Sequence, residues 1–254
     1  MPPGPAMRLI VAQLLCIALL AAAPLRAEEA DGATVEERRT MESIVVTATR
    51  IEESLLDVTE AISVIDADEI RRWAPDVVAE MLRGVPGTFF QQTTPGQGIP
   101  IIRGLKGSQV LHLVDGMRLN NAFFRDAPNQ YLGLVDSFTT RRMEVVRGAQ
   151  GSLYGADAMG GVLNILTFEP DFSGPDWQHE SSLYGSYDSV DDGVVFNART
   201  QGGRQGFGFA GGASYQHHGS RDNGDGETLK PSGFESRAAD VKFVMDAGGR
   251  AGLM

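Results

Sequence analysis

Residues 207–216 read FGFAGGASYQ, and their side chains alternate between two kinds. Because successive side chains of a β-strand point to opposite faces, Phe207, Phe209 and Tyr215 fall on one face, and small or polar residues such as Ser214 and Gln216 on the other. Residues 239–246 repeat the pattern, residues 177–188 and 194–201 show weaker versions, and residues 201–204 have the composition of a short turn. Strands of about ten residues with one apolar face predict an antiparallel transmembrane β-barrel, although a soluble β-sandwich gives similar alternation.

Upstream of these strands, residues 61–168 predict one α+β domain. Apolar runs rich in β-branched residues predict strands at residues 61–65, 99–103, 110–114, 143–147 and 160–167. Asp66 or Asp68 can cap a helix that ends before Pro75, and residues 76–83 resemble a second short helix with an acidic cap. Two long polar and aromatic loops, residues 89–98 and 117–132, lie between these elements.

The first 27 residues have the composition of a secretory signal peptide. Arg8 precedes an apolar run of about fifteen residues, and Ala27, followed by two glutamates, is the expected cleavage site. A retained anchor helix is the alternative, but the run is shorter than the ~20 residues that a membrane-spanning helix needs. Cys16 is the single cysteine of the chain and lies in this segment, so we expect no disulfide in the exported protein.

Two segments of different character follow. Residues 28–41 are polar and charged and resemble a flexible tail, whereas residues 42–50 (ESIVVTATR) concentrate β-branched side chains. Such a segment can add itself as a strand to the sheet of another protein, with backbone hydrogen bonds supplying the affinity. It can equally form the first strand of the domain that follows, and the residues alone leave both interpretations open.

The composition argues against several classes of function. A net charge of −11 is unsuited to a nucleic-acid partner, because phosphate contacts depend on basic side chains. The sequence holds no metal-ligand cluster and no nucleophile motif, and residues 151–155 (GSLYG) do not match G-x-S-x-G. We therefore predict neither an enzyme nor a bound cofactor.

Five short motifs follow one another along the chain: ESIVVTA at 42–48, IIRG at 101–104, VLHLVDG at 110–116, MEVVRG at 143–148 and LYGADAMGGVLNILT at 153–167. In order and spacing they resemble the TonB-dependent outer-membrane receptors. The resemblance implies a TonB box at Glu42, Ser43, Ile44, Val45, Val46, Thr47 and Ala48. It divides the chain into a signal peptide (1–27), a flexible tail with the TonB box (28–50), an α+β plug domain (51–168) and the first ~4 strands of a truncated, incomplete antiparallel transmembrane β-barrel (169–254).

The resemblance also implies a function. Receptors of this family enclose the plug in a barrel of about 22 strands, so we expect this chain to be an incomplete receptor. It implies export to the outer membrane of a Gram-negative cell, contact with outer-membrane lipid, and energy supplied by TonB with ExbB and ExbD. The expected function is uptake of a scarce metal chelate, ferric siderophore or haem first and cobalamin second. A non-transporting, plug-only or decayed fragment is the alternative.

Individual residues take roles from the same resemblance. Arg103 and Arg147 match Arg-Gly motifs and are expected to pair with barrel carboxylates, the alternative being surface salt bridges worth about 0–1 kcal/mol. Two outward plug loops are expected to contact a planar or anionic chelate through Phe89, Phe90, Gln91, Gln92, Gln97, Asn120, Phe123, Phe124, Arg125 and Tyr131. Packing against extracellular loops is the alternative role of these side chains. We expect His217 and His218 at a barrel rim rather than as haem ligands, and residues 222–227 as a polar loop tip rather than a calcium site.

Overall fold

The computed structural model describes residues 45–46, 53–54, 60–92, 94–119, 131–170 and 174–245, all within one compact unit. The predicted signal peptide, residues 28–41 of the tail and most of the predicted TonB box lie outside the described residues. No helix in the described part of the chain is both long and apolar enough to cross a membrane. The elements, in chain order, are β1 (Val45–Val46), β2 (Glu53–Ser54), β3 (Ala61–Asp66), α2 (Ala67–Trp73), η2 (Val78–Gly84), β4 (Thr88–Gln91), β5 (Ile99–Ile102), η3 (Gly107–Gln109), β6 (Val110–Val114), β7 (Met117–Arg118), η4 (Tyr131–Leu134), η5 (Ser137–Thr139), β8 (Thr140–Arg147), α3 (Gly151–Tyr154), β9 (Gly161–Thr167), β10 (Gln178–Asp188), β11 (Gly193–Arg204), β12 (Phe207–His218) and β13 (Phe234–Met245).

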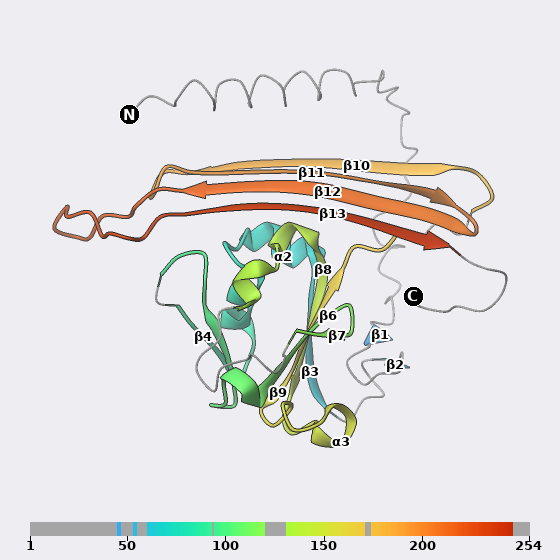
Figure 1. Ribbon diagram of the computed structural model, residues 1–254, viewed down its shortest axis with the longest axis horizontal. Coiled ribbons are helices and arrows are strands. Elements are labelled where there is room, and N and C mark those ends of the chain that lie inside the picture. Colours follow the sequence, from blue (N-terminus) through green and yellow to red (C-terminus); the bar gives the residue numbers. More distant parts are fainter. Residues whose placement is uncertain are drawn as a thin grey trace, which may run out of the picture. The chain divides into compact units, whose positions relative to one another are not determined.

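The α+β domain, residues 60–168, is built on a five-stranded sheet in the order β3-β8-β9-β6-β7 (Figure 1). β6 and β9 run parallel, and the other neighbours run antiparallel. The main core, which includes Leu82, Ile102, Met143 and Ile165, joins the sheet to α2 and η2. A smaller cluster forms around Tyr154. The strands predicted at residues 61–65, 110–114, 143–147 and 160–167 are confirmed.

The first helix begins and ends at local signals. Asp66 Oδ1 accepts the Glu69 N–H at 2.8 Å, which satisfies one of the free amide groups of the first turn. After the helix, Ala74 adopts the left-handed conformation (φ 44°), its N–H bonds to Ile70 O, and Pro75 follows. The cap predicted at Asp66 is confirmed.

The second predicted helix is wrong in type and in its cap. Val78–Gly84 is a 3-10 helix, and its N-cap residue, Val77, makes no side-chain cap bond. The physical reason lies in Asp76, whose carboxylate is turned toward His218 and Arg221 instead of toward the first turn.

The predicted loop at residues 89–98 is partly wrong, because a strand opens it. β4 pairs antiparallel with β5, placing Phe89 opposite Ile101 and Phe90 opposite Pro100. The polar and glycine-rich residues that follow suggested a loop, but β5 supplies the backbone partners that turn Thr88–Gln91 into a strand.

The C-terminal strands β10 to β13 form a separate antiparallel sheet, the four-stranded sheet, in chain order (Figure 1). The turn predicted at residues 201–204 is wrong: β11 continues there, because Gly202 pairs with both His179 and Phe209. The chain turns at Gly206, where φ is 86°. In the described residues the sheet is open, with β10 and β13 at its edges.

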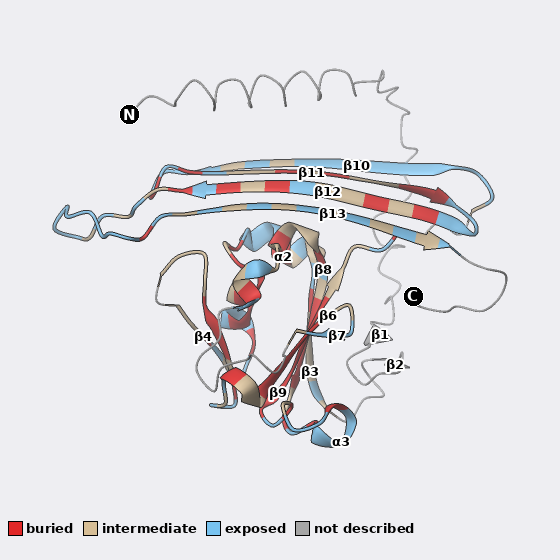
Figure 2. Ribbon diagram, viewed as in Figure 1, coloured by how far each residue is buried: buried red, intermediate tan, exposed pale blue. Residues whose placement is uncertain are grey.

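The four-stranded sheet buries small and polar side chains and exposes apolar ones, the opposite of a sheet in a soluble protein; Figure 2 shows the buried and exposed positions. On β12 the buried positions are small or polar: Gly208, Ala210, Ser214, Gln216 and His218. On β13 the apolar side chains Val241, Phe243 and Met245 are 71%, 67% and 75% exposed. A small, polar inner face and an apolar outer face are the pattern of a membrane barrel wall, and the sheet resembles the start of one.

Candidate functional site

The first predicted substrate loop divides between exposed and buried residues. Phe89 is 62% exposed, whereas Phe90 is 4% exposed and belongs to the main core. The Arg83 guanidinium lies 5.4 Å from the centroid of the Phe90 ring, and a Cβ on Gly98 would come within 1.9 Å of its tip. The expectation that Phe90 contacts substrate is therefore corrected: strand alternation turns this ring inward.

Amide side chains of the same loop bind their own domain. Gln92 accepts a hydrogen bond from Arg83 Nη2 and donates one to Glu80 Oε1, both at 2.8 Å. Gln97 donates to Thr94 Oγ1, and Gln91 is half-buried. Burial, together with the nearby Asp76 carboxylate, raises the pKa of Glu80. Gln92 and Gln97 thus shape the loop, and their contacts with substrate stay a prediction.

The second predicted loop falls largely outside the described residues. Asn120, Phe123, Phe124 and Arg125 all lie there. Tyr131 begins η4 and is 37% exposed, and its contact with substrate stays a prediction.

The two arginines of the Arg-Gly motifs lie at turns of the α+β domain. Arg147 ends β8 and donates to two backbone carbonyls, Ala61 O at 3.1 Å and Pro86 O at 2.8 Å. Arg103 is exposed and has a positive φ of 50°. Its guanidinium lies against Gly148, where an added Cβ would approach Arg103 Nη1 to 3.0 Å. Their pairing with barrel carboxylates stays a prediction.

Two residues of the predicted TonB box form a strand within the chain. Val45 pairs with Ser54 and Val46 with Glu53, antiparallel. Glu42, Ser43, Ile44, Thr47 and Ala48 lie outside the described residues. The segment can therefore still pair with the sheet of a partner or with a strand of its own chain, and both interpretations stay open.

Three aspartates of the α+β domain face donors of the four-stranded sheet or of the connection after β12. The sequence alone assigned none of them to a site. Ser214 Oγ donates to Asp136 Oδ2 at 2.9 Å, and Lys242 Nζ donates to Asp115 Oδ2 at 3.3 Å. Asp76 faces Arg221 and His218. Burial raises the pKa of Asp136, although the hydrogen bond from Ser214 opposes the shift. The one signal in the sequence was the small, polar face of β12, which marks a surface packed against a polar partner.

The contact around Asp76 is a partly buried cluster of ionisable groups at the ends of the strands. Arg221 Nε donates to Asp191 Oδ2 at 2.8 Å, and Arg221 Nη2 lies 3.4 Å from Asp76 Oδ2. His218 Nδ1 lies 3.2 Å from Asp191 Oδ1, and His218 Nε2 lies 3.7 Å from Asp76 Oδ1. Burial opposes ionisation of Asp191, but hydrogen bonds from Arg221 and His218 hold its pKa below the usual value. His218 ends β12 at this cluster.

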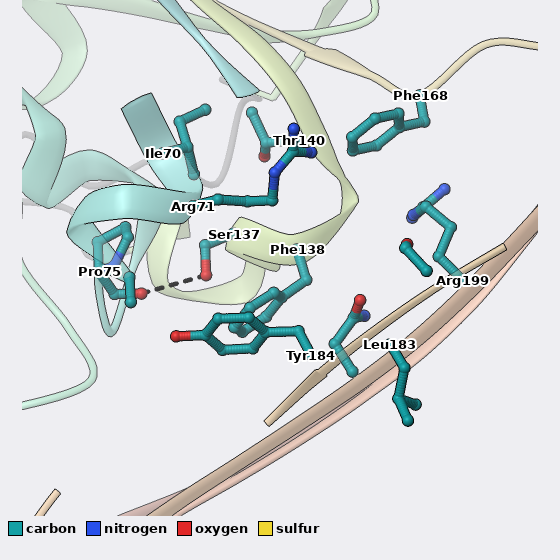
Figure 3. Close-up of a pocket in the computed structure, with 13 residues that line it drawn as sticks. Ile70, Arg71, Pro75, Ser137, Phe138, Thr140, Phe168, Leu183, Tyr184 and Arg199 are labelled. Carbon is teal, nitrogen blue, oxygen red and sulfur yellow. Dashed lines mark hydrogen bonds between the residues drawn. The ribbon is translucent and has the colours of Figure 1, made fainter. Parts of the chain in front are cut away.

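Two cavities lie between the α+β domain and the four-stranded sheet. The smaller, about 120 Å³, is lined by Ile70, Thr140, Phe168, Asn197 and Arg199 among others (Figure 3). The larger, about 350 Å³, is lined by Trp73, Asp76, Asp188, Gln216 and His218 among others. Phe138 and Tyr184, whose ring centroids are 5.2 Å apart, line both. The described residues therefore leave polar space beside Asp76 and His218.

Comparisons with known proteins agree with this architecture. The family model described as the TonB-dependent Receptor Plug Domain matches residues 54–162. The vitamin B12 transporter BtuB of Vibrio vulnificus strain CMCP6 is 36% identical over 145 residues, which are 54% of this chain and 22% of that protein. BtuB of strain YJ016 is 35% identical over 156 residues, 60% of this chain and 24% of that protein. The chain therefore spans less than a quarter of the length of these relatives.

Solved structures share the fold. The copper transporter OprC matches with a TM-score of 0.60 and 20% identity, over 74% of this chain and 28% of that chain. A mutant of the ferric enterobactin receptor PfeA from Pseudomonas aeruginosa, in complex with enterobactin, matches with a TM-score of 0.55 and 20% identity, over 76% of this chain and 32% of that chain. The siderophore receptor PirA from Acinetobacter baumannii matches with a TM-score of 0.55 and 19% identity, over 74% of this chain and 29% of that chain.

Proposed function

We propose that the chain carries the plug domain of a TonB-dependent receptor and takes part in TonB-dependent uptake of a metal chelate across the outer membrane. The family match over residues 54–162 carries the proposal. The four-stranded sheet supports it, because its polar face contacts the plug and its apolar face is exposed, as a lipid-facing wall requires.

Two substrate classes have separate support. Cobalamin is favoured by the 36% identity to a protein named as a vitamin B12 transporter. A ferric siderophore or haem is favoured by the exposed aromatic rings of Phe89 and Tyr131, which suit a planar or aromatic chelate. An intact receptor that carries this chain as its N-terminal part distinguishes them: uptake of labelled cobalamin, of ferric siderophore or of haem identifies the class, and uptake of none contradicts the proposal.

We expect TonB to be the partner, through residues 42–48. An extended segment that joins the sheet of a partner depends on its backbone N–H groups, and proline lacks one. Val46→Pro should therefore abolish binding to the C-terminal domain of TonB in a titration, with ExbB and ExbD needed only for energised uptake in cells. Val35→Pro, the same substitution in the preceding polar segment, is the matched control and should leave the affinity unchanged. Equal affinities for wild type and Val46→Pro would contradict the role of the box.

A further inference from the structure

Among the contacts between the plug and the four-stranded sheet, His218 has the surroundings of a metal ligand. Its side chain is 5% exposed, and its Nε2 atom makes no hydrogen bond in the described structure. On the opposite side of the ring, Nδ1 lies 3.2 Å from Asp191 Oδ1. An ionised carboxylate only accepts hydrogen bonds, so in the neutral ring the proton lies on Nδ1 and the lone pair on Nε2. The histidine thus presents a free metal-binding atom.

The surrounding residues hold the ring in one orientation. Phe234 stacks on it with the ring centroids 4.6 Å apart and the planes 10° from parallel. A Cβ added at Gly193 would lie 2.7 Å from His218 Nδ1, so the Gly193 backbone packs closely against this side of the ring. Arg221 Nε fixes the Asp191 carboxylate at 2.8 Å. Histidines that bind metals usually donate their other N–H to a carboxylate in this way.

A second ligand atom faces His218 Nε2. Asp76 Oδ1, from the plug, lies 3.7 Å away, and two ligand atoms on one tetrahedral Zn²⁺ ion are about 3.4 Å apart. Both residues line the cavity of about 350 Å³, which has room for water or further ligands. The distance between His218 Nε2 and Asp76 Oδ1 therefore has to shorten by only a few tenths of an ångström for both atoms to bind one ion.

The charges around the pair favour a cation. With a neutral imidazole, the two carboxylates of Asp76 and Asp191 outnumber the single guanidinium of Arg221, and Asp188 adds a further negative charge to the cavity lining. Imidazole and carboxylate together suit Zn²⁺, Cu²⁺ or Ni²⁺, whereas Mg²⁺ and Ca²⁺ prefer oxygen ligands alone.

We propose that His218 Nε2 and the Asp76 carboxylate bind a divalent transition-metal ion at the junction of the plug and the four-stranded sheet. No set of three or more His, Cys, Asp or Glu side chains suited to a metal converges in the part of the chain that the structure describes. The site therefore supplies two protein ligands, one fewer than open zinc sites have, and leaves the remaining positions to water from the cavity. The bound ion joins a plug residue to a strand end, and the inference does not rest on the proposed transport function.

The test uses Zn²⁺ and the full chain in detergent, with Cys16→Ser removing the one thiol. Competition against a fluorescent zinc indicator should show one saturable site. His218→Gln and Asp76→Asn should each weaken binding at least about tenfold, and Asp191→Asn, which frees the ring, by about 10- to 100-fold. His217→Gln is the matched control, because His217 is the neighbouring residue on the opposite face of β12 and its side chain is 49% exposed; it should bind Zn²⁺ like the parent chain. Excess Mg²⁺ should not compete.

A measurement on the parent chain covers the case in which a variant fails to fold. The chain has four imidazole rings that ¹⁵N NMR spectra can follow. Zn²⁺ should change the chemical shift of Nε2 in one of them, His218, at the concentration at which the indicator reports binding. The competing interpretation is a protonated His218 held between Asp76 and Asp191 without any metal. Absence of saturable binding, an equal loss in His217→Gln and His218→Gln, or equal shifts of all four rings would overturn the proposal.

Discussion

At the scale of single residues, His112 makes the stability of the plug depend on pH. Its side chain is 1% exposed within β6, opposite Leu163, and burial lowers its pKa to about 4 from 6.5. The folded state therefore keeps the ring neutral while the unfolded state takes up a proton below pH 6.5. The contribution of the neutral ring to the free energy of unfolding is complete above pH 6.5. It is lost as the pH falls toward 4, and the total loss is about 3 kcal/mol.

His112→Leu should remove this dependence on pH, because leucine has no proton to bind. Urea unfolding followed by the fluorescence of Trp73, in a Trp177→Phe background, measures the free energy of unfolding at pH 7.5, 6 and 5. His179→Leu, at an exposed position of β10, is the control. Its free energy of unfolding should change with pH with the same slope as that of the parent chain. An unchanged slope in His112→Leu would show that other groups cause it.

At the scale of elements, the β4–β5 hairpin depends on the absence of a side chain at Gly98. A Cβ there would lie 1.9 Å from Phe90 Cζ, and the Phe90 ring is buried in the core and cannot move away freely. Gly98→Ala should lower the free energy of unfolding by about 1–3 kcal/mol, the usual cost of overpacking. Gly84→Ala, at a position with no atom within 4 Å of the added Cβ, should change it by less than about 0.5 kcal/mol. Equal effects in urea unfolding would contradict the packing explanation.

The same hairpin illustrates what the sequence could predict. Strands with a continuous apolar signal, such as Val110–Val114 and Gly161–Thr167, and the helix capped by Asp66 follow from local chemistry. Thr88–Gln91 does not, because its strand state depends on pairing with β5. Alternation revealed the two faces of β12, but only the packed structure shows that the small, polar face is buried.

The candidate site was less predictable than the elements, since its residues take their partners from distant segments. The sequence predicted a helix cap at Asp76 from its neighbours along the chain alone, and it assigned Asp115 no partner. In the structure Asp76 meets Arg221, and Asp115 meets Lys242. Asp115 also forms a turn with Gly116, with φ of 49° and 75°, so one residue serves both the turn and the contact with the sheet.

At the scale of the whole molecule, Arg199 connects the plug to the four-stranded sheet. From β11, its Nη2 donates to Asp240 Oδ1 of β13 at 2.8 Å, and its guanidinium carbon lies 4.6 Å from the centroid of the Phe168 ring, just after the last plug strand. The Arg199 side chain is 6% exposed, so little water weakens its attraction to the ring.

A double-mutant cycle on Arg199→Ala and Phe168→Ala should therefore give a coupling energy of about 0.5–2 kcal/mol in urea unfolding of the full chain. Arg199 belongs to the four-stranded sheet and Phe168 follows the last plug strand, so this energy measures contact between the plug and the sheet rather than the stability of either alone. Arg204→Ala, at an exposed position on the same strand, paired with Phe168→Ala is the control and should be additive within about 0.5 kcal/mol. Additivity in both cycles would mean that the plug and the four-stranded sheet do not stabilise each other through this contact, and that Arg199 serves the sheet alone through Asp240.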